Sequence, residues 1–198
     1  LTNMNVPTPQ ILKIMPYVLG QQNRHAGDKS FTSNDGDFGM DAKLGVSSSL
    51  TLDLTYNTDF AQVEADEQQI NLDRFSLFFP EKRSFFLENA GLFSVGEGGT
   101  FYGPDIEMFF SRRIGIGEGG TQVPILGGGR LTGTLSGLKV GALSMRTDAV
   151  EDVSDGNHYS VMRLKKELPN RTYFGGMFTD LNHLGEGGYA NRGYAVDG

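Results

Sequence analysis

Carboxylates crowd the chain between residues 59 and 88, and carboxylates are the side chains best suited to acid–base chemistry. Among them are Asp59, Glu64, Asp66, Glu67, Glu81 and Glu88. A glycosidase uses such a pair to protonate the leaving group and to activate water. Glu64 and Glu88 are the two candidates for that catalytic role. The chain has no tryptophan to form a sugar platform, so the favoured role of these acids is ion pairing.

Basic partners for these acids lie in the same part of the chain. Bidentate arginine–carboxylate pairs can fix a loop that has to sit in a polar interior. We therefore expect the acids to pair with Arg74, Lys82, Arg83, Arg112 and Arg113.

A metal or cofactor site has weaker support. Asp35, Asp37 and Asp41 could offer oxygen ligands to calcium, but the EF-hand spacing and its closing glutamate are absent. A solvated turn is the favoured interpretation. The GxGxxG match at 115–120 runs into Val123-Pro124 rather than into a helix. There is no cysteine, and we expect no cofactor.

Strands must position these side chains, because alternation is the dominant periodic signal. Residues 44–56 alternate apolar with small or polar side chains, and a turn near Ser47–Ser49 would follow a first strand at 41–46. A second hairpin is predicted over 127–147. With Ser136-Gly137 as its turn, Leu135 faces Leu138 and Leu131 faces Ala142.

Other segments complete an all-β, antiparallel meander in a single domain over 1–198. Further strands are predicted at 11–19, 106–113, 158–167, 173–180 and 192–196, and a long polar loop at 23–37. The helix candidate is 67–79, which Pro80 would end.

Composition excludes some classes of partner. A net charge of −7 argues against nucleic acid, which needs a basic face. No stretch reaches the ~20 apolar residues of a membrane helix. The start of the chain lacks a signal-peptide pattern, as in a mature form, a fragment or a cytosolic protein.

The doublets Phe78-Phe79 and Phe85-Phe86 fit either a core beneath a loop or a partner surface.

The run from Asn57 to Glu88 resembles the signature of an uncharacterised bacterial family of outer-membrane β-barrels, a domain of unknown function. The family pattern reads N-P-D-F-x-Q-V-E-x-D, V-N-L-x-R-F and F-F-P-E-K-R-P-F-F-L-E. The matching positions include Asp59, Gln62, Glu64, Asp66, Arg74, Glu81, Lys82, Arg83 and Glu88. Thr58 and Ser84 stand where the family has proline. Family members often carry a carbohydrate-binding module of the family-nine type ahead of this region.

The resemblance implies a bacterial outer-membrane location and part of a transmembrane barrel with an inserted charged and aromatic loop. It supplies no catalytic residues. Leu50, Leu52, Leu54 and Tyr56 would face lipid, and Thr51, Asp53 and Thr55 the lumen. The expected function is a non-catalytic channel, transport or surface component. Its partners would be the lipid bilayer and a polysaccharide or a secreted or periplasmic protein.

Two alternatives remain open on the residues alone. A soluble β-sandwich that binds carbohydrate or hydrolyses glycosides would show the same alternation, because a core prefers leucine as much as lipid does. The second alternative is a scaffold that docks a partner through the aromatic segment.

Overall fold

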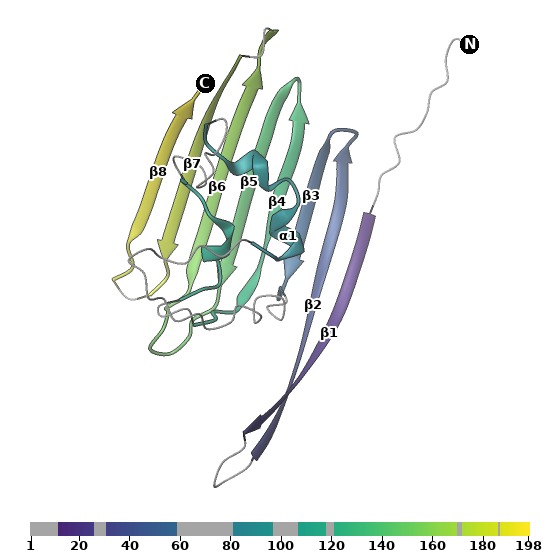
Figure 1. The fold of residues 1–198 in the computed structure, drawn as a ribbon, viewed down its shortest axis with the longest axis vertical. Helices are drawn as coiled ribbons and strands as arrows, with labels where there is room; N and C mark the ends of the chain where they lie inside the picture. Colours follow the sequence, from purple (N-terminus) through teal and green to yellow (C-terminus); the bar gives the residue numbers. More distant parts are fainter. Residues whose placement is uncertain are drawn as a thin grey trace, which may run out of the picture.

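The chain folds into one antiparallel sheet of eight strands in sequence order, β1 to β8 (Figure 1). The computed structural model describes residues 12–25, 31–58, 81–96, 107–117, 121–169, 172–185 and 187–198. The strands are β1 (Leu12–His25), β2 (Phe31–Ser47), β3 (Leu50–Tyr56), β4 (Ile125–Leu135), β5 (Leu138–Thr147), β6 (Asn157–Glu167), β7 (Tyr173–His183) and β8 (Ala190–Asp197). The predicted all-β antiparallel meander is therefore confirmed.

The described strands form an open sheet, with β1 and β8 as its edges. The family resemblance implies only part of a transmembrane barrel, and these strands do not close into a barrel by themselves. Each strand pairs only with its neighbours in sequence.

The hairpin of β4 and β5 has the predicted register. Leu135 pairs with Leu138 and Leu131 with Ala142. Ser136 and Gly137 both have positive φ, 50° and 74°, which is the geometry of a type I′ turn and suits the twist of paired strands. The β2–β3 turn at Ser48-Ser49 is also confirmed.

Two sequence predictions were wrong. The segment 23–37, expected to be a loop, is largely strand, because β1 extends to His25 and β2 starts at Phe31. Backbone ladders do not require apolar side chains, so polar composition misled us. The strand expected at 106–113 is absent from its described part, 107–113. Three of those residues form the 3₁₀ turn η2 (Ser111–Arg113), and Met108 and Phe109 pack on the core instead.

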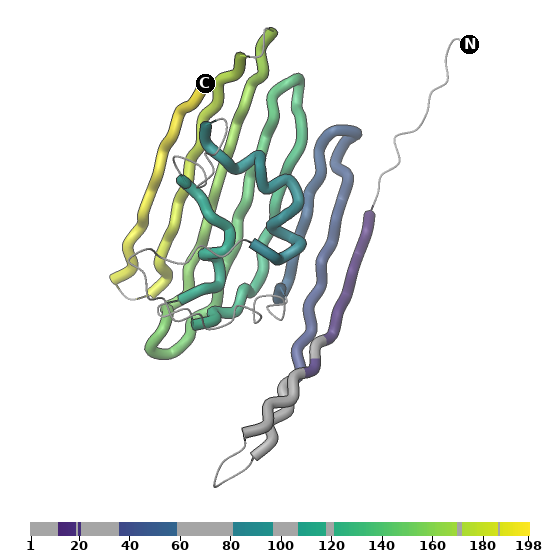
Figure 2. Tube along the Cα trace, viewed as in Figure 1, coloured from purple at the N-terminus to yellow at the C-terminus, as the bar shows by residue number. Residues whose placement is uncertain are grey.

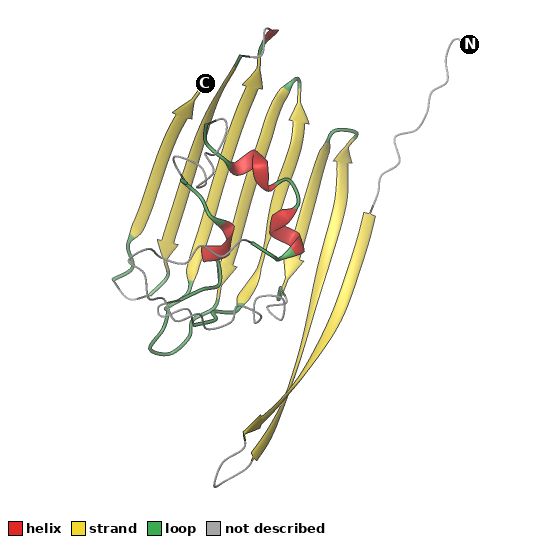
Figure 3. Ribbon diagram, in the orientation of Figure 1, coloured by secondary structure: helices red, strands yellow, loops and turns green. Residues whose placement is uncertain are grey.

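Two described segments of the long connection between β3 and β4, 81–96 and 107–117, lie over one face of the sheet. Figures 1 and 2 show them over the middle strands. We call these two segments together the insert. Figure 3 shows that its helical content is α1 (Ser84–Leu87), the 3₁₀ turn η1 (Ala90–Phe93) and η2. No helix in the described ranges has the length and apolarity needed to cross a membrane.

The core lies between the insert and the sheet. Phe85, Phe86, Phe93 and Ile114 of the insert pack against a patch on the sheet. That patch is made of Ile125, Leu143, Met145, Val161 and Met177. The insert-facing side of the sheet also buries polar residues, among them Asp53, Thr55, Arg130, Thr132 and Arg163. The inner face, as we name this side, thus combines an apolar patch beneath the insert's phenylalanines with buried charged and hydroxyl side chains.

The opposite side of the sheet, which we call the outer face, carries the alternate residues of each strand. It includes Leu12, Val18, Phe38, Leu54, Tyr56, Met162, Phe174, Tyr194 and Val196, all of them exposed. No described segment crosses this face in the view of Figure 1. These apolar side chains would form the core of a soluble protein, but here they are exposed.

Candidate functional site

Arg83 is buried and joins the two segments of the insert, 81–96 and 107–117, which we call its arms. Its side chain is 2% exposed and pairs with Glu81, with Nη2 2.7 Å from Oε2 and Nε 2.8 Å from Oε1. The remaining donors reach across to the second arm, Nη1 to the Ile114 carbonyl (2.7 Å) and Nη2 to the Ser111 carbonyl (2.8 Å). The guanidinium also lies 4.2 Å from the ring centre of Phe86. One arginine thus satisfies backbone carbonyls on a segment 28–31 residues away.

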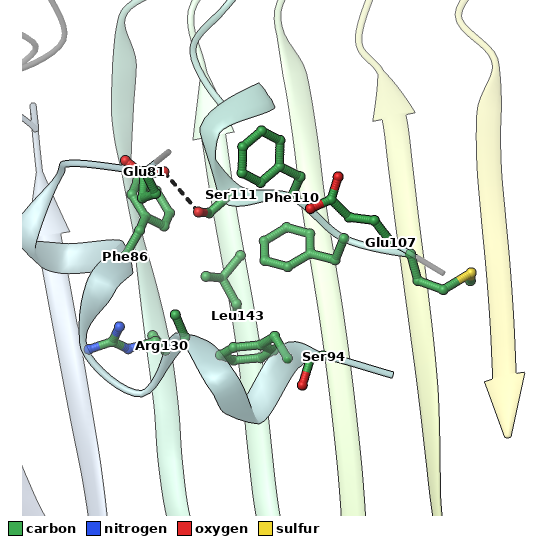
Figure 4. Close-up of a pocket in the computed structure, with 12 residues that line it drawn as sticks. Glu81, Phe86, Ser94, Glu107, Phe110, Ser111, Arg130 and Leu143 are labelled. Carbon is green, nitrogen blue, oxygen red and sulfur yellow. Dashed lines mark hydrogen bonds between the residues drawn. The ribbon is translucent and has the colours of Figure 1, made fainter. Parts of the chain in front are cut away.

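Glu81 is the acidic centre of this arm-to-arm contact. Burial works to raise the pKa of its carboxyl, but the hydrogen bonds and positive charge of Arg83 outweigh it, with help from Ser111 Oγ at 2.8 Å. The pKa of Glu81 is therefore held below its ordinary value. Figure 4 shows the Ser111–Glu81 bond at the edge of a pocket. A carboxylate kept ionised in this way is poorly suited to act as a general acid.

Arg130 fastens the insert to the sheet. This β4 side chain is 1% exposed. Its Nη2 donates to Asp53 Oδ2 on β3 at 2.9 Å, and its Nη1 donates to the carbonyls of Phe85 and Glu88. Asp53 neutralises the arginine from within the sheet, while two insert carbonyls accept from its other arm. Arg130 therefore docks the insert on the sheet through charge-assisted hydrogen bonds from both Nη atoms of its guanidinium.

Lys43 and Glu88 extend this network toward solvent. Lys43 Nζ pairs with Glu88 and lies 3.4 Å from Asp53 Oδ1. Glu88 is 49% exposed, and its Oε2 is 3.8 Å from Arg130 Nη2. The network alternates charge from Glu88 through Lys43 and Asp53 to Arg130. Glu88, a catalytic candidate from the sequence, is thus placed as an ion-pair partner.

An apolar pocket of about 200 Å³ lies between the insert and the sheet (Figure 4). Its walls are mainly Phe86, Phe93, Phe109, Phe110 and Leu143. Glu81 and Glu107 also line it, but Glu81 is committed to Arg83. The pocket offers contact area to an apolar group and no paired acid and base.

Several predicted site residues lie outside the described residues. These are Asp59, Gln62, Glu64, Asp66 and Arg74, together with Glu67, Phe78, Phe79 and the helix candidate at 67–79. Among the others, Arg112 is buried and Arg113 and Lys82 are exposed. The Lys82 backbone N–H donates to Glu81 Oε1 at 3.1 Å.

The three aspartates proposed as calcium ligands lie on one strand rather than in a turn. The side chain of Asp35 is outside the described side chains. Asp37 accepts from Asn57, and Asp41 accepts from Thr55 Oγ1 at 2.7 Å. Four residues of extended strand separate Asp37 from Asp41 by about 13 Å, too far to share an ion. No cluster of metal-ligating residues occurs in the described parts of the chain.

Sequence reasoning missed the residues that anchor the insert from the sheet. Lys43, Asp53 and Arg130 belong to strands, and so do Arg163 and Asp197, whose bidentate pair has both N–O distances at 2.6 Å. The sequence does contain a signal for the Asp53–Arg130 pair. Each of these residues occupies a polar position of an alternating strand. If the connection between the two strands folds over the sheet, the strands can pair directly and bring the opposite charges together.

The family assignment rests on a match over the first part of the chain. The model of a domain of unknown function, DUF5916, matches residues 8–123. This range contains β1, β2, β3 and the insert, while β4 to β8 lie beyond it. No curated protein and no solved structure matches the chain. Since the matched range covers more than half of the 198 residues, the chain belongs to the DUF5916 family of domains of unknown function.

Proposed function

We propose that this chain forms part of the wall of a bacterial outer-membrane β-barrel, with the outer face in lipid and the insert inside the lumen. The observation that carries the proposal is the exposed apolar outer face. Val196 is 87% exposed, Val18 83% and Tyr194 72%. Isolated exposed apolar residues are ordinary, but a contiguous apolar surface across all the strands of a sheet requires something to cover it.

The two faces of the sheet differ as the two faces of a barrel wall do. A transmembrane barrel is apolar toward lipid and polar toward its interior. Here Asp53, Arg130 and Arg163 are buried on the inner face, and register partners such as Ala142, Met162 and Phe178 form an apolar row on the other.

Strand length supports the same proposal. A transmembrane β-strand needs about 9–11 residues. Strands β4 to β7 contain 11, 10, 11 and 11 residues. Polar outer-face residues stand near their ends, with Lys166 at one end of β6 and His158 at the other.

Connection lengths give the proposed wall an orientation. Bacterial barrels have short periplasmic turns and longer extracellular loops. The two-residue turns β2–β3 and β4–β5 lie at one end of the sheet, and the β3–β4 connection leaves from the opposite end (Figure 1). On this rule the insert enters the lumen from the extracellular end. A loop fixed there narrows the passage, which suits a channel or transport component without catalysis, acting on a polysaccharide or another polar cargo.

The test compares lysine substitutions at two depths on the outer face of β6. Met162 lies mid-strand, and His158 lies on the same face at the end of β6. A lysine in mid-bilayer costs about 2–4 kcal/mol, against about 0–1 near the interface. We expect Met162→Lys to lower the unfolding free energy of the full-length protein in lipid vesicles by that larger amount, and His158→Lys to change it little.

The soluble β-sandwich makes a different prediction for the same protein. There the outer face would pack on another sheet, and the full-length protein would stay monomeric in buffer without detergent. That behaviour would contradict the membrane proposal, and so would equal stability of Met162→Lys and wild type in vesicles.

A further inference from the structure

The pocket of about 200 Å³ between the insert and the sheet is walled by phenylalanine rings from both arms. Phe86 and Phe93 come from the first arm and Phe109 and Phe110 from the second, and Leu143 of β5 lines the pocket from the sheet (Figure 4). We infer that this pocket binds a small quaternary ammonium compound, a choline-like cation by chemical class. A cavity of about 150 Å³ holds a benzene ring, so this one can take a trimethylammonium group with a short chain.

Phe93 and Phe109 give the pocket two aromatic walls at an angle to each other. Their ring centres are 5.9 Å apart and their planes meet at 63°, so the two rings form a corner rather than a flat stack. Phe93 is buried and Phe109 is half-buried, so both side chains are held by their surroundings. The face of an aromatic ring is negative and attracts a cation within about 6 Å of its centre. Because one face of Phe86 already lies 4.2 Å from the Arg83 guanidinium, we assign the ligand contact chiefly to Phe93 and Phe109.

One carboxylate of the pocket stays available to a ligand. Glu81 is paired with Arg83, and the Arg130 guanidinium is paired with Asp53. Glu107 lines the same pocket, is exposed, and makes no ion pair or hydrogen bond with any residue that the structure describes. The charge that remains on the lining is therefore negative, which favours a cation over an anion.

The chemistry of the walls favours a quaternary over a primary ammonium. A primary ammonium carries three N–H donors, which lose their water when the group enters an apolar site. Phenyl rings and Leu143, which make up most of the lining, offer no strong acceptors in exchange. A quaternary ammonium has no N–H, so its methyl groups can contact the rings while its charge stays close to Glu107.

The experiment is titration calorimetry of the full-length protein with choline and two matched ligands. 3,3-Dimethylbutan-1-ol has the shape of choline without its charge, and ethanolamine has the charge on a primary ammonium. We expect saturable choline binding, with each of the other two binding at least about tenfold more weakly. If detergent is needed, one without an ammonium headgroup is used.

A third ligand, phosphocholine, distinguishes a lipid headgroup from a free quaternary ammonium, since both carry the trimethylammonium group. The Glu107 carboxylate would repel the phosphate. We therefore expect phosphocholine to bind more weakly than choline.

Variants separate the pocket from general effects of charge and of aromatic area. Phe109→Leu keeps an apolar side chain and should weaken choline binding at least about threefold, through the lost ring. Glu107→Gln changes an exposed position that is not needed for folding and should weaken binding about two- to fivefold, the range for an exposed ion pair. The matched controls are Phe174→Leu on the outer face and Glu151→Gln in the β5–β6 connection, both at exposed positions outside the pocket. Both controls should bind choline as the wild type does.

Four results would overturn the inference. They are no choline binding to the wild type, equal affinity for choline and its neutral analogue, tighter binding of phosphocholine than of choline, and equal losses in the pocket variants and their controls. None of them bears on vesicle insertion, because the pocket lies on the inner face of the sheet. This inference and the membrane proposal therefore fail separately.

Discussion

Asp53 on β3 and Arg130 on β4 are direct register partners, and their side chains meet at 2.9 Å although 77 residues separate them in sequence. The pair closes the connection that contains the insert, and the free arm of Arg130 then holds that insert by two carbonyls. This cross-strand contact thus joins the β3–β4 pairing to the placement of the loop between these strands.

Replacing Arg130 with methionine should release the insert. Removing one partner of a buried ion pair costs about 3–5 kcal/mol, and we expect the lower end because Lys43 still lies 3.4 Å from Asp53. Urea unfolding of the full-length protein measures the change. The control is Arg146→Met, which removes an exposed arginine from the outer face of β5 and should cost less than about 0.5 kcal/mol. Equal effects would contradict the anchoring role.

Acid should weaken the arm-to-arm contact at Glu81. The folded-state pKa of this carboxyl is lowered, so its stabilisation is complete above the unfolded pKa of about 4.3 and is lost as pH falls through the lower folded value. We expect the urea midpoint of wild type to fall more steeply below about pH 4.3 than that of Glu81→Gln. Glu107→Gln, at an exposed carboxylate of the same pocket, should follow wild type. Parallel curves for wild type and Glu81→Gln would count against the prediction.

Gly39 leaves room for a contact between β1 and the end of β3. Tyr17 OH donates to the Asn57 carbonyl at 2.7 Å, directly over Gly39. A Cβ on Gly39 would overlap both of these groups. Gly39→Ala should therefore displace Tyr17 and cost about 1–3 kcal/mol in unfolding free energy. Gly20→Ala on β1 is the control, since nothing lies within 4 Å of its Cβ. A stable Gly39→Ala variant would show that the tyrosine contact contributes little.

Gly175 allows Arg163 on β6 to reach over β7 to Asp197 on β8. A Cβ on Gly175 would lie 2.6 Å from Arg163 Nη1, so Gly175→Ala should disturb the bidentate pair. The adjacent Gly176 faces the other side, with its nearest atom 3.8 Å away. We expect a loss of about 1–3 kcal/mol for Gly175→Ala and little for Gly176→Ala, by urea unfolding. If the difference in unfolding free energy between Gly175→Ala and Gly176→Ala disappears when Asp197→Asn is also present, the lost stability comes from the Arg163–Asp197 ion pair.

The strands and the tight hairpin were predictable because their signals are local. Alternation specifies which residues share a face, and the Ser136-Gly137 turn specifies the β4–β5 register through two positive φ angles. Neither signal needs knowledge of distant residues. Polar composition at 23–37 was a poor guide, because strand pairing is carried by the backbone.

The amino-acid sequence by itself determined the strand pattern, the division of each strand into an apolar and a polar face, and the family. The tertiary structure decided which face is covered. Alternation cannot do so, since a period of two is the same whichever side is buried. The insert covers the polar face because Arg83 and Arg130 satisfy its carbonyls there and Phe85, Phe86 and Phe93 find an apolar patch. Those contacts join residues tens of positions apart, and only folding brings them together.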